Sequence, residues 1–216
     1  ILSPTGLMVG ADGLLSGSPD APAVATATSA QVPLWPLLQN TGFDAPAVHH
    51  LLTTPASEHQ LVAAARDAAR AAGWAGMHLD LENVAAADRD ALSALVADLA
   101  TGLHADARRL AVAVVPHRPG HENSVNAAYD LAAIGRAADL VTLMAYEQHS
   151  PSGDPGPVAG LSWDSQILDG SASAVGDPAR TLLGMALYAR TWGDGGDNYA
   201  DAYAASVAAA PPPGGG

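Results

Sequence analysis

The sequence predicts an α/β protein built on a parallel sheet that is covered by helices. Short, nearly continuous apolar runs, such as RLAVAVV at 109–115, alternate along the chain with longer helical stretches. Strands buried on both faces have this character, and their alternation with helices is typical of a parallel sheet. No GxGxxG follows any apolar run, so a dinucleotide-binding sheet has no support.

The elements expected in the first part of the chain follow from apolar runs and helix caps. They are a short strand at 1–3, a turn at 11–13, a weak helix at 21–30, a strand at 32–38, a polar loop at 39–44, a helix from Thr54 to Gly73 and a strand at 76–82. The helix from Thr54 is the best marked. Thr54 and Pro55 suit its N-cap and first turn, and Gly73 suits its end.

The second part of the chain continues the alternation. We expect a helix at 86–104, a strand at 109–115, a helix at 126–138, a strand at 139–146, a helix starting near Ser162 and a strand at 181–188. About six strands result in all. Since a complete barrel of eight β/α units usually needs about 250 residues, a complete barrel does not fit the 216 residues of this chain.

Composition excludes several classes of function. The formal net charge is −13, and all nine basic residues are Arg, with no cluster beyond the pair Arg108 and Arg109. We therefore expect neither a nucleic-acid partner nor binding to an anionic membrane surface. No apolar run approaches the roughly 18 residues of a membrane span, and the absence of Cys excludes disulfides and thiolate metal sites. Sugars, small molecules and neutral polymers stay open as partners.

One strand carries three polar side chains. In GMHLDLENV, residues 76–84, His78, Asp80 and Glu82 alternate with apolar residues. Alternate residues of a strand share a face, so the three point together, with Glu82 nearest the carboxyl end. Active sites of parallel α/β folds lie at that end. Because burying carboxylates costs free energy, such a column needs partners or a purpose.

Three interpretations of this column are open from the residues alone. It could be an inward polar network that holds a barrel together. It could be a metal site, since His117, His121 and His149 also lie near expected strand ends, although no HExxH-type pair occurs. It could perform acid/base chemistry on a sugar, with Glu82 as the proton donor and Asp80 setting its proton affinity.

The chain resembles family 18 of the glycoside hydrolases, the group that includes chitinases, in five blocks that occur in the family's order. AGMHLDLE at 75–82 looks like its DGxDxDxE signature, LMAYEQH at 143–149 like its MxYD segment, and GMALYARTW at 184–192 like its seventh-strand segment. PGPVAGLSW at 155–163 and AYDLAAIGRAADLV at 128–141 are similar to a bacterial subgroup that acts on peptidoglycan.

The resemblance implies an α/β barrel of the TIM type, (β/α)8, of which about strands 2–7 are present. Residues 1–195 would form this partial barrel, and 196–216 a C-terminal segment that ends in a Pro/Gly-rich tail. We expect the sequence to be part of a longer open reading frame. LysM or other wall-binding domains would lie elsewhere in the full protein.

The resemblance also assigns roles to residues. Glu82 would protonate the glycosidic oxygen, Asp80 would orient the substrate's acetamido group, and Tyr146 would donate a hydrogen bond to the acetamido oxygen. This is substrate-assisted catalysis without an enzymic nucleophile. The expected substrate-binding residues are His78, Met144, Glu147, His149, Tyr188, Arg190 and Trp192. The family's chemistry needs no metal and no cofactor.

The chain departs from the family pattern in four places. Ala75 and His78 replace the first and second Asp of the signature, and Glu147 stands where the family usually has Asp. No eighth strand follows the seventh-strand segment, and the family's Trp at the base of the sugar site goes with it. A neutral His78 could still hydrogen-bond to Asp80, whereas a protonated His78 would lower the pKa of Asp80.

We expect a retaining hydrolase that cleaves β-1,4 bonds next to N-acetylglucosamine in peptidoglycan or chitin-like glycans. Two alternatives stand beside it: a non-catalytic, lectin-like relative that only binds glycan, and a metal-dependent barrel hydrolase. The expected partner is a polysaccharide, with no nucleic acid and no membrane insertion. Such a substrate implies action outside the cell or in the cell envelope.

Overall fold

The computed structural model describes residues 1–149, 153–192 and 198–202. A seven-stranded sheet runs through its centre in the order β2-β1-β3-β4-β5-β6-β7. The strands are β1 Leu7–Val9, β2 Leu15–Gly17, β3 Leu37–Asn40, β4 Gly76–Asp80, β5 Arg109–Val114, β6 Leu140–Leu143 and β7 Thr181–Leu183. Six strands are parallel, and β2 alone pairs antiparallel, with β1. The predicted parallel sheet is therefore confirmed.

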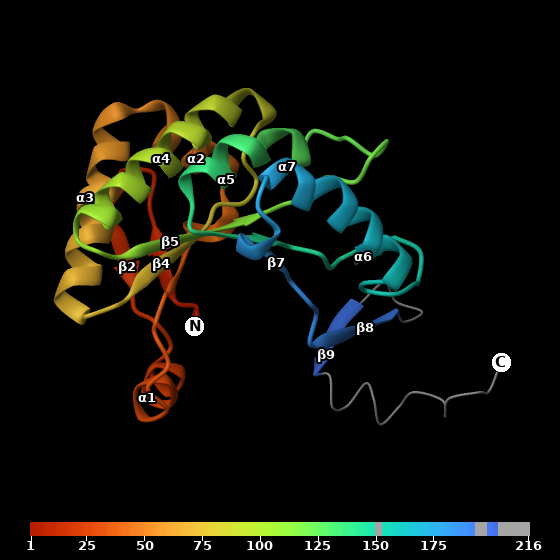
Figure 1. Cartoon of the computed structure of the whole chain (residues 1–216), viewed down its shortest axis with the longest axis horizontal. Coiled ribbons are helices and arrows are strands. Elements are labelled where there is room, and N and C mark those ends of the chain that lie inside the picture. The colour runs from red at the N-terminus through yellow and green to blue at the C-terminus, as the bar shows by residue number, and fades with distance from the viewer. Residues whose placement is uncertain (150–152, 193–197, 203–216) are drawn as a thin grey trace.

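Helices cover one face of this sheet, above it in Figure 1, and leave the other face open over much of its area. The α-helices are α1 Ala21–Ser29, α2 Ala45–Thr53, α3 Pro55–Ala72, α4 Arg89–Ala105, α5 Leu131–Ala137, α6 Leu161–Ile167 and α7 Ser173–Val175. A π-helical segment, η4 Leu168–Ala172, joins α6 to α7. Short 3-10 turns are η1 Thr41–Phe43, η2 Ala86–Asp88, η3 Asn126–Ala128 and η5 Pro178–Arg180.

The hydrophobic core lies between the sheet and the helices. Met77, Leu79 and Leu81 of the β4 segment all belong to it. Because side chains alternate along a strand, His78, Asp80 and Glu82 face the other side, which the helices leave open. The predicted alternation of this segment is thus present. Truncating a fully buried leucine such as Leu79 would cost about 2–5 kcal/mol.

The N-terminal segment differs from its prediction. The expected strand at 1–3 is a single bridge between Leu2 and Leu34, and the first true strands are β1 and β2. The expected turn at 11–13 joins these two strands, and Gly10 N–H bonds to Leu14 O at 3.0 Å. Gly13 is required in this turn, since it has φ +80° and a Cβ there would lie 2.0 Å from Ser57 O.

Three further boundaries are corrected. The strand expected at 32–38 begins only at Leu37, because Pro33 and Pro36 have no N–H to donate to a ladder. It extends to Asn40, into the expected polar loop. The helix expected at 126–138 is split: after η3, Asp130 caps α5 by accepting from Ala133 N at 2.9 Å.

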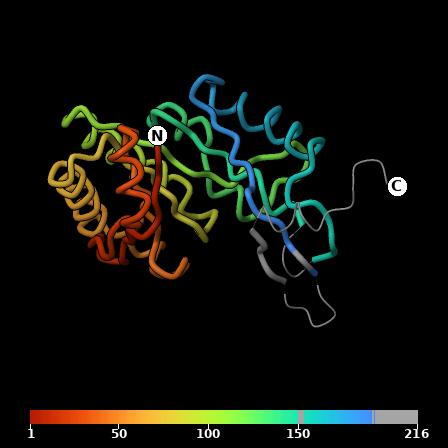
Figure 2. Tube along the Cα trace, turned by 90° about the horizontal axis from the view of Figure 1, so that it is seen from below, coloured from red at the N-terminus to blue at the C-terminus, as the bar shows by residue number. Residues whose placement is uncertain are grey.

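The strand expected at 181–188 is divided as well. Thr181–Leu183 forms β7, whereas Tyr188–Trp192 forms β8, which pairs antiparallel with β9, Asn198–Ala202. Met185 and Leu187 between them are 73% and 74% exposed. Figure 2 shows the orange-yellow helix α3 and the blue strand β8 on opposite sides of the molecule. The sheet is unclosed, with β2 and β7 at its edges.

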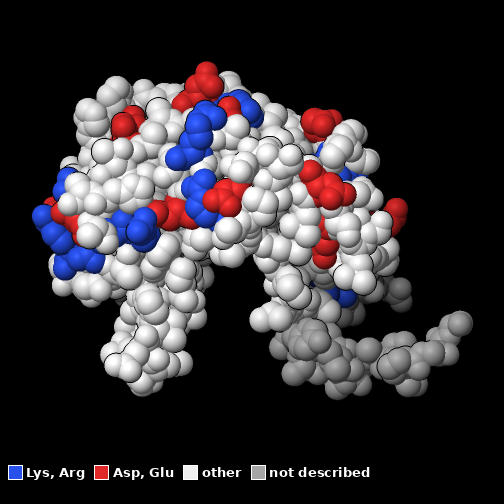
Figure 3. Space-filling view, viewed as in Figure 1, with Lys and Arg blue, Asp and Glu red and all other residues white. Residues whose placement is uncertain are grey.

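Charged side chains of both signs lie interspersed over the helical layer in Figure 3, without a continuous basic stripe on this face. Among the described helices, none combines the length and the apolar character that a membrane crossing requires. The predicted boundary at 195 stays a prediction, and of the expected tail, residues 203–216 lie outside the described part of the chain.

Candidate active site

The candidate acid, Glu82, follows the carboxyl end of β4 and is held through its backbone. Asn40, at the end of β3 and only 2% exposed, accepts from Glu82 N at 2.9 Å and donates to Glu82 O at 3.1 Å. The buried Tyr129 hydroxyl donates to Leu81 O at 2.8 Å. These bonds leave the Glu82 carboxyl group free and fix the point from which it projects.

Two causes raise the pKa of the Glu82 carboxyl group above its ordinary value. The larger is burial, which disfavours the charged form, and the second is the negative charge of Asp80. A carboxyl group with a raised pKa stays protonated at higher pH than an ordinary glutamate. Glu82 is therefore suited to give a proton to a bound molecule.

Asp80 lies beneath Glu82 and is 6% exposed. Gln39, its direct partner across the β3–β4 ladder, donates from Nε2 to Asp80 Oδ2 at 3.0 Å. Burial raises the pKa of Asp80, and the bond from Gln39 partly opposes this rise. The second oxygen, Oδ1, is buried without a hydrogen-bond partner among the described residues. That atom is a free acceptor beside the candidate acid.

His78 is the lowest member of the column. Its Nδ1 lies 3.2 Å from Ser3 Oγ, and its Nε2 is buried with no partner in the described part of the chain. Burial lowers the pKa of the ring to about 4, so the imidazole is neutral at neutral pH. The hydrogen bond to Asp80 that the sequence allowed is not formed among the described contacts.

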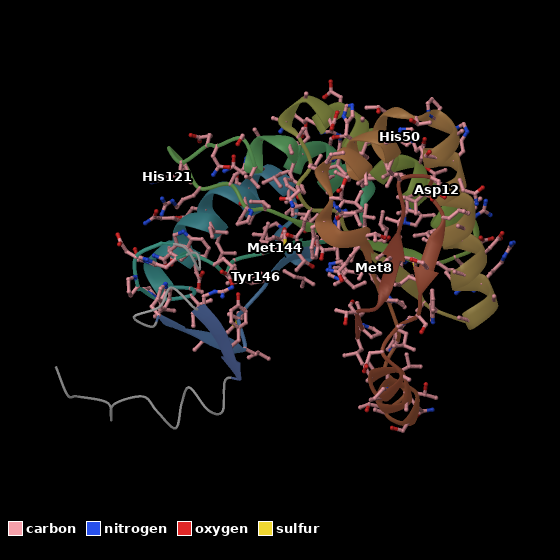
Figure 4. The ribbon with its side chains drawn as sticks, turned by 180° about the vertical axis from the view of Figure 1, so that it is seen from behind. Met8, Asp12, His50, His121, Met144 and Tyr146 are labelled. Atoms are coloured by element: carbon pink, nitrogen blue, oxygen red, sulfur yellow. The ribbon has the colours of Figure 1, made fainter. Side chains whose placement is uncertain are left out.

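Tyr146 follows the end of β6. Burial, and then the negative charges of Asp80 and Glu82, raise its pKa to about 12, so its hydroxyl keeps its proton and can donate it in a hydrogen bond. Figure 4 shows Met144 and Tyr146 beside each other, with His121 farther out. Gly184 allows this packing, since a Cβ there would lie 2.7 Å from Leu143 O and 3.2 Å from Tyr146 Cε1.

Glu147 is bound by the β8 strand. Arg190 donates to it from Nε at 2.9 Å and from Nη2 at 2.6 Å, and the Tyr188 hydroxyl donates to Oε1. Burial by itself would raise the pKa of Glu147. The bonds from Arg190 and Tyr188 and the Arg190 charge outweigh burial and hold the pKa below its ordinary value. Glu147 is thus an ionised carboxylate whose partners are already in place.

A pocket of about 370 Å³ brings part of the predicted site together. Its predicted members are Glu82, Met144, Tyr146 and Glu147. The other walls come from the loop after β5 and from α6. They comprise Val115, Pro116, Arg118, His121, Asn123, Asn126, Trp163 and Ile167. The pocket thus brings the candidate acid together with polar side chains that follow other strands.

The other predicted residues do not line the pocket, and these include Asp80 and His78 of the β4 column. Arg190 contacts the site through Glu147. Tyr188 contacts it through Glu147 and through Tyr146, whose ring it meets edge-on at a centroid distance of 6.4 Å. His149 Nδ1 lies 3.0 Å from Asp154 O. Trp192 Nε1 is buried without a partner among the described residues. Tyr188 and Arg190 thus hold the Glu147 side chain, and His149 contacts the backbone of the loop that follows β6.

Several residues of the site were missed from sequence. Gln39 and Asn40 were assigned to a loop, and Arg118, Asn123 and Trp163 were given no role. Two signals were available: Gln39 and Asn40 directly follow an apolar run, and the 116–126 segment follows the carboxyl end of a strand. In both places a parallel sheet presents side chains to ligands.

The described residues contain no set of three or more His, Asp and Glu side chains that could hold a metal ion. Of the histidines considered for such a site, His117 lies with Nε2 2.7 Å from Asn126 O. The Nε2 atom of this ring thus already contacts a backbone carbonyl. The metal-dependent hydrolase is therefore not supported by the arrangement of these residues.

Comparison with known proteins bears on the family and on the fold. The family model "Glycosyl hydrolases family 18" matches residues 42–211. YdhD of Bacillus subtilis, whose name describes a sporulation-specific glycosylase, is 30% identical over 156 residues, which are 72% of this chain and 36% of that protein. A second curated relative is YvbX of Bacillus subtilis, an uncharacterized glycosylase, at 22% identity over 84% of this chain and 54% of that protein.

Solved structures show the same fold. The chitinase of Chromobacterium violaceum superimposes with a TM-score of 0.88 at 30% identity, over 96% of this chain and 67% of that one. The spore cortex-lytic enzyme SleL of Bacillus megaterium does so with a TM-score of 0.84 at 21% identity, over 94% of this chain and 48% of that one. With the unclosed parallel sheet, this likeness confirms the expected incomplete barrel.

The chain spans about a third and about half the length of the two curated relatives. Its family match covers far more than half of its own residues, including β4, β6 and the pocket between them. The chain belongs to family 18 of the glycosyl hydrolases.

Proposed function

We propose that this protein hydrolyses β-1,4 glycosidic bonds next to N-acetylglucosamine in peptidoglycan or a chitin-like glycan, by a retaining, substrate-assisted mechanism. One observation carries the proposal. Glu82, with a raised pKa, lines the same pocket as the neutral phenol Tyr146. Asp80, two residues before Glu82 on the same face of the β4 segment, offers a buried Oδ1 that has no partner among the described residues. An acid and a donor thus line one pocket, with an acceptor on the strand that carries the acid.

The first step breaks the glycosidic bond. Glu82 gives its proton to the bridging oxygen, and the leaving sugar departs with that oxygen as a hydroxyl group. The acetamido oxygen of the substrate attacks the anomeric carbon from the opposite face and forms an oxazolinium ring. Asp80, through its free Oδ1, would accept the acetamido N–H and stabilise the positive charge of that ring. Tyr146 would donate to the acetamido oxygen and hold it in line for attack.

The second step restores the enzyme. Glu82, now a carboxylate, takes a proton from water, and the water oxygen attacks the anomeric carbon as the ring opens. Two inversions at that carbon give net retention. The rigid attachment of Glu82 to β3 through Asn40 suits both steps, because the carboxyl group serves first as acid and then as base from one position.

One relative is named a chitinase, and others are named a sporulation-specific glycosylase and a spore cortex-lytic enzyme. We take chitin and peptidoglycan as the two candidate polymers. Both polymers contain N-acetylglucosamine and lie outside the cytoplasmic membrane, where we expect the protein to act. A non-catalytic, glycan-binding protein is the alternative. The presence of both Glu82 and Asp80 favours the enzyme, since loss of the acid would be expected of a protein that only binds.

The test compares the full-length protein with its Glu82→Gln variant on purified peptidoglycan and on chitin oligosaccharides. Product masses should show new reducing N-acetylglucosamine ends for the wild type and a loss on the order of 10²–10⁴-fold in the variant. Glu58→Gln, the same change on α3, is the matched control and should keep full activity. Binding of either polymer without cleavage by the wild type would establish the alternative.

A further inference from the structure

One arginine side chain lines the pocket together with the candidate acid. Arg118 lies on the loop after β5 and lines the same pocket as Glu82. Within the described part of the chain its side chain makes no ion pair and no hydrogen bond, and only its backbone O accepts, from His121 N at 3.0 Å. Six of the other eight arginines do form ion pairs: Arg66, Arg70, Arg89, Arg109, Arg180 and Arg190. Of the three arginines without an ion pair among the described residues, Arg108, Arg118 and Arg136, only Arg118 lines the pocket.

None of the three glutamates on the Arg118 loop or in the pocket, Glu122, Glu147 and Glu82, forms an ion pair with Arg118 among the described residues. Glu122, on the same loop, accepts from Gly120 N at 3.2 Å, and its own and the Gly120 backbone N–H groups lower its pKa more than any charged side chain does. Glu147 is held by Arg190. Glu82 is uncharged when it acts as the acid. The guanidinium group of Arg118 thus remains available to a negatively charged group that enters the pocket.

The loop that carries Arg118 is fixed at both ends. The fully buried Ser171 accepts from His117 N and donates to His117 O, both at 2.9 Å. At the other end, Asn126 Nδ2 donates to His121 O at 3.2 Å, and Asn123 Oδ1 accepts from Asn126 N at 3.0 Å. A cation on such a loop needs little ordering when it binds its partner.

Close packing fixes the same loop against η4. A Cβ on Gly170 would lie 2.8 Å from His117 O and 2.7 Å from Pro119 Cδ. The loop therefore rests directly on the backbone of the π-helical segment, one residue on each side of Arg118. His121 lies on the same pocket wall and can donate a further hydrogen bond when a ring nitrogen carries a proton.

We propose that Arg118 binds a carboxylate carried by the glycan, so that the pocket favours a polymer with acidic groups over neutral chitin. This inference rests on the proposed function and chooses between its two polymers. In peptidoglycan, the carboxylate belongs either to the lactyl ether of a muramic acid residue or, where that group is in an amide bond, to the attached peptide. Arginine suits both, because its fork of N–H donors matches a carboxylate in charge and shape.

The overall charge makes a local site necessary. A protein of net charge −13 repels an acidic polymer at long range, although salt screens this repulsion beyond about 10 Å. A bound acidic sugar therefore needs a specific cation at short range. Arg118 is the one arginine on the pocket wall that the described residues provide.

The experiment measures kcat/KM of the full-length protein on three substrates of matched length. These are glycan strands stripped of peptide, which carry free lactyl carboxylates, strands that keep their peptides, and neutral chitin oligosaccharides. We expect Arg118→Gln to lower the ratio of acidic to neutral substrate by about tenfold or more. Arg118→Lys should restore part of it. A larger loss on the peptide-free strands would identify the lactyl carboxylate as the group that Arg118 binds. A larger loss on the peptide-bearing strands would identify a carboxylate of the peptide.

Arg136→Gln is the matched control, since Arg136 is an exposed arginine on α5, away from the pocket. It should leave the ratio unchanged. An unchanged ratio in Arg118→Gln, or an equal loss on all three substrates, would overturn the inference. If the wild type cleaves none of the substrates, the proposed function fails. Calorimetric binding of the same glycans then tests the inference about Arg118 by itself. Weaker binding of the acidic strands alone by Arg118→Gln then supports the inference, and equal binding overturns it.

Discussion

Two glutamates line the same pocket, and their surroundings give them opposite properties. Glu82 follows β4, where burial and the Asp80 charge raise its pKa. Glu147 follows β6, where Arg190 and Tyr188 hold its pKa below the ordinary value in spite of burial. Glu82 has its backbone fixed and its carboxyl group free, whereas Glu147 has its carboxylate bound. The comparison teaches that partners, not residue type, decide which carboxyl group can act as an acid.

Among the changes that test this comparison, the largest effect is expected from removing the charge of Asp80. Asp80→Asn should lower kcat on the order of 10²-fold, because the acetamido group loses its charged acceptor. It should also shift the pH profile. Activity is lost as pH rises through the pKa of Glu82, and without the Asp80 charge this pKa falls, so the basic limb of kcat/KM moves to lower pH. Asp67→Asn on α3 is the control.

A basic limb that stays in place in Asp80→Asn would show that burial alone sets the proton affinity of Glu82. The difference between the pKa values of Glu82 and Glu147 would then come from burial at Glu82 and from hydrogen-bonding and charged partners at Glu147 alone. Because Asp80 and Glu82 interact, the limbs of the pH profile give pKa values of the pair and not of one residue. The test therefore compares the position of the basic limb in the wild type and in Asp80→Asn.

The next effect sharpens the comparison by testing whether His78 contributes charge to the β4 column. The pKa of His78 is lowered to about 4 from an ordinary 6.5. Between these values the unfolded chain binds more protons than the folded one, so stability falls as pH drops from 6.5 toward 4. The loss from this group is at most about 3 kcal/mol. Urea unfolding at pH 7 and pH 4.5 measures it.

His78→Gln should remove most of this dependence, and His50→Gln, a change on the surface of α2, should keep it. If both variants lose stability with falling pH as the wild type does, folding does not lower the pKa of His78, and the ring is protonated at pH 4.5. The β4 column would then hold a charged imidazole that offsets the charge of Asp80.

The smallest effect concerns Glu147. Glu147→Gln leaves the Arg190 side chain, 14% exposed, without its charged partner and should cost about 1–2 kcal/mol of unfolding free energy. The basic limb of kcat/KM should stay where it is, since Glu147 does not set the pKa of Glu82. Denaturant unfolding and the same pH series test both points, with Glu58→Gln as control. A shift as large as that of Asp80→Asn would erase the contrast between the two glutamates.

The sequence predicts correctly those strands and helices whose burial requires a clear pattern of apolar residues. Strands β4, β5 and β6 and the long helices α3 and α4 have this clear signal. β1 was missed because Leu7–Val9 is only three residues long. The 181–188 run was predicted as one strand because its residues are apolar. Their burial depends on a neighbouring strand, and within the described residues none covers Met185 and Leu187.

The candidate site was predictable where its residues lie on one strand. The alternation of His78, Asp80 and Glu82 places them on one face without any knowledge of the fold. Partners that come from other strands left no such local pattern. Gln39 meets Asp80 through the register of two strands 41 positions apart, and Arg118 meets the pocket through a loop of irregular backbone.

The central claim is that Glu82 and Glu147 have opposite pKa shifts, and carboxyl ¹³C NMR of glutamate-labelled protein tests it most directly. The 216 residues contain four glutamates, at 58, 82, 122 and 147, which single Glu→Gln variants would assign. The account predicts that Glu82 titrates above the ordinary value of 4.5 and Glu147 below it, and that Asp80→Asn lowers only the former. Titration of Glu82 at or below 4.5, with Glu147 at or above it, would contradict the account.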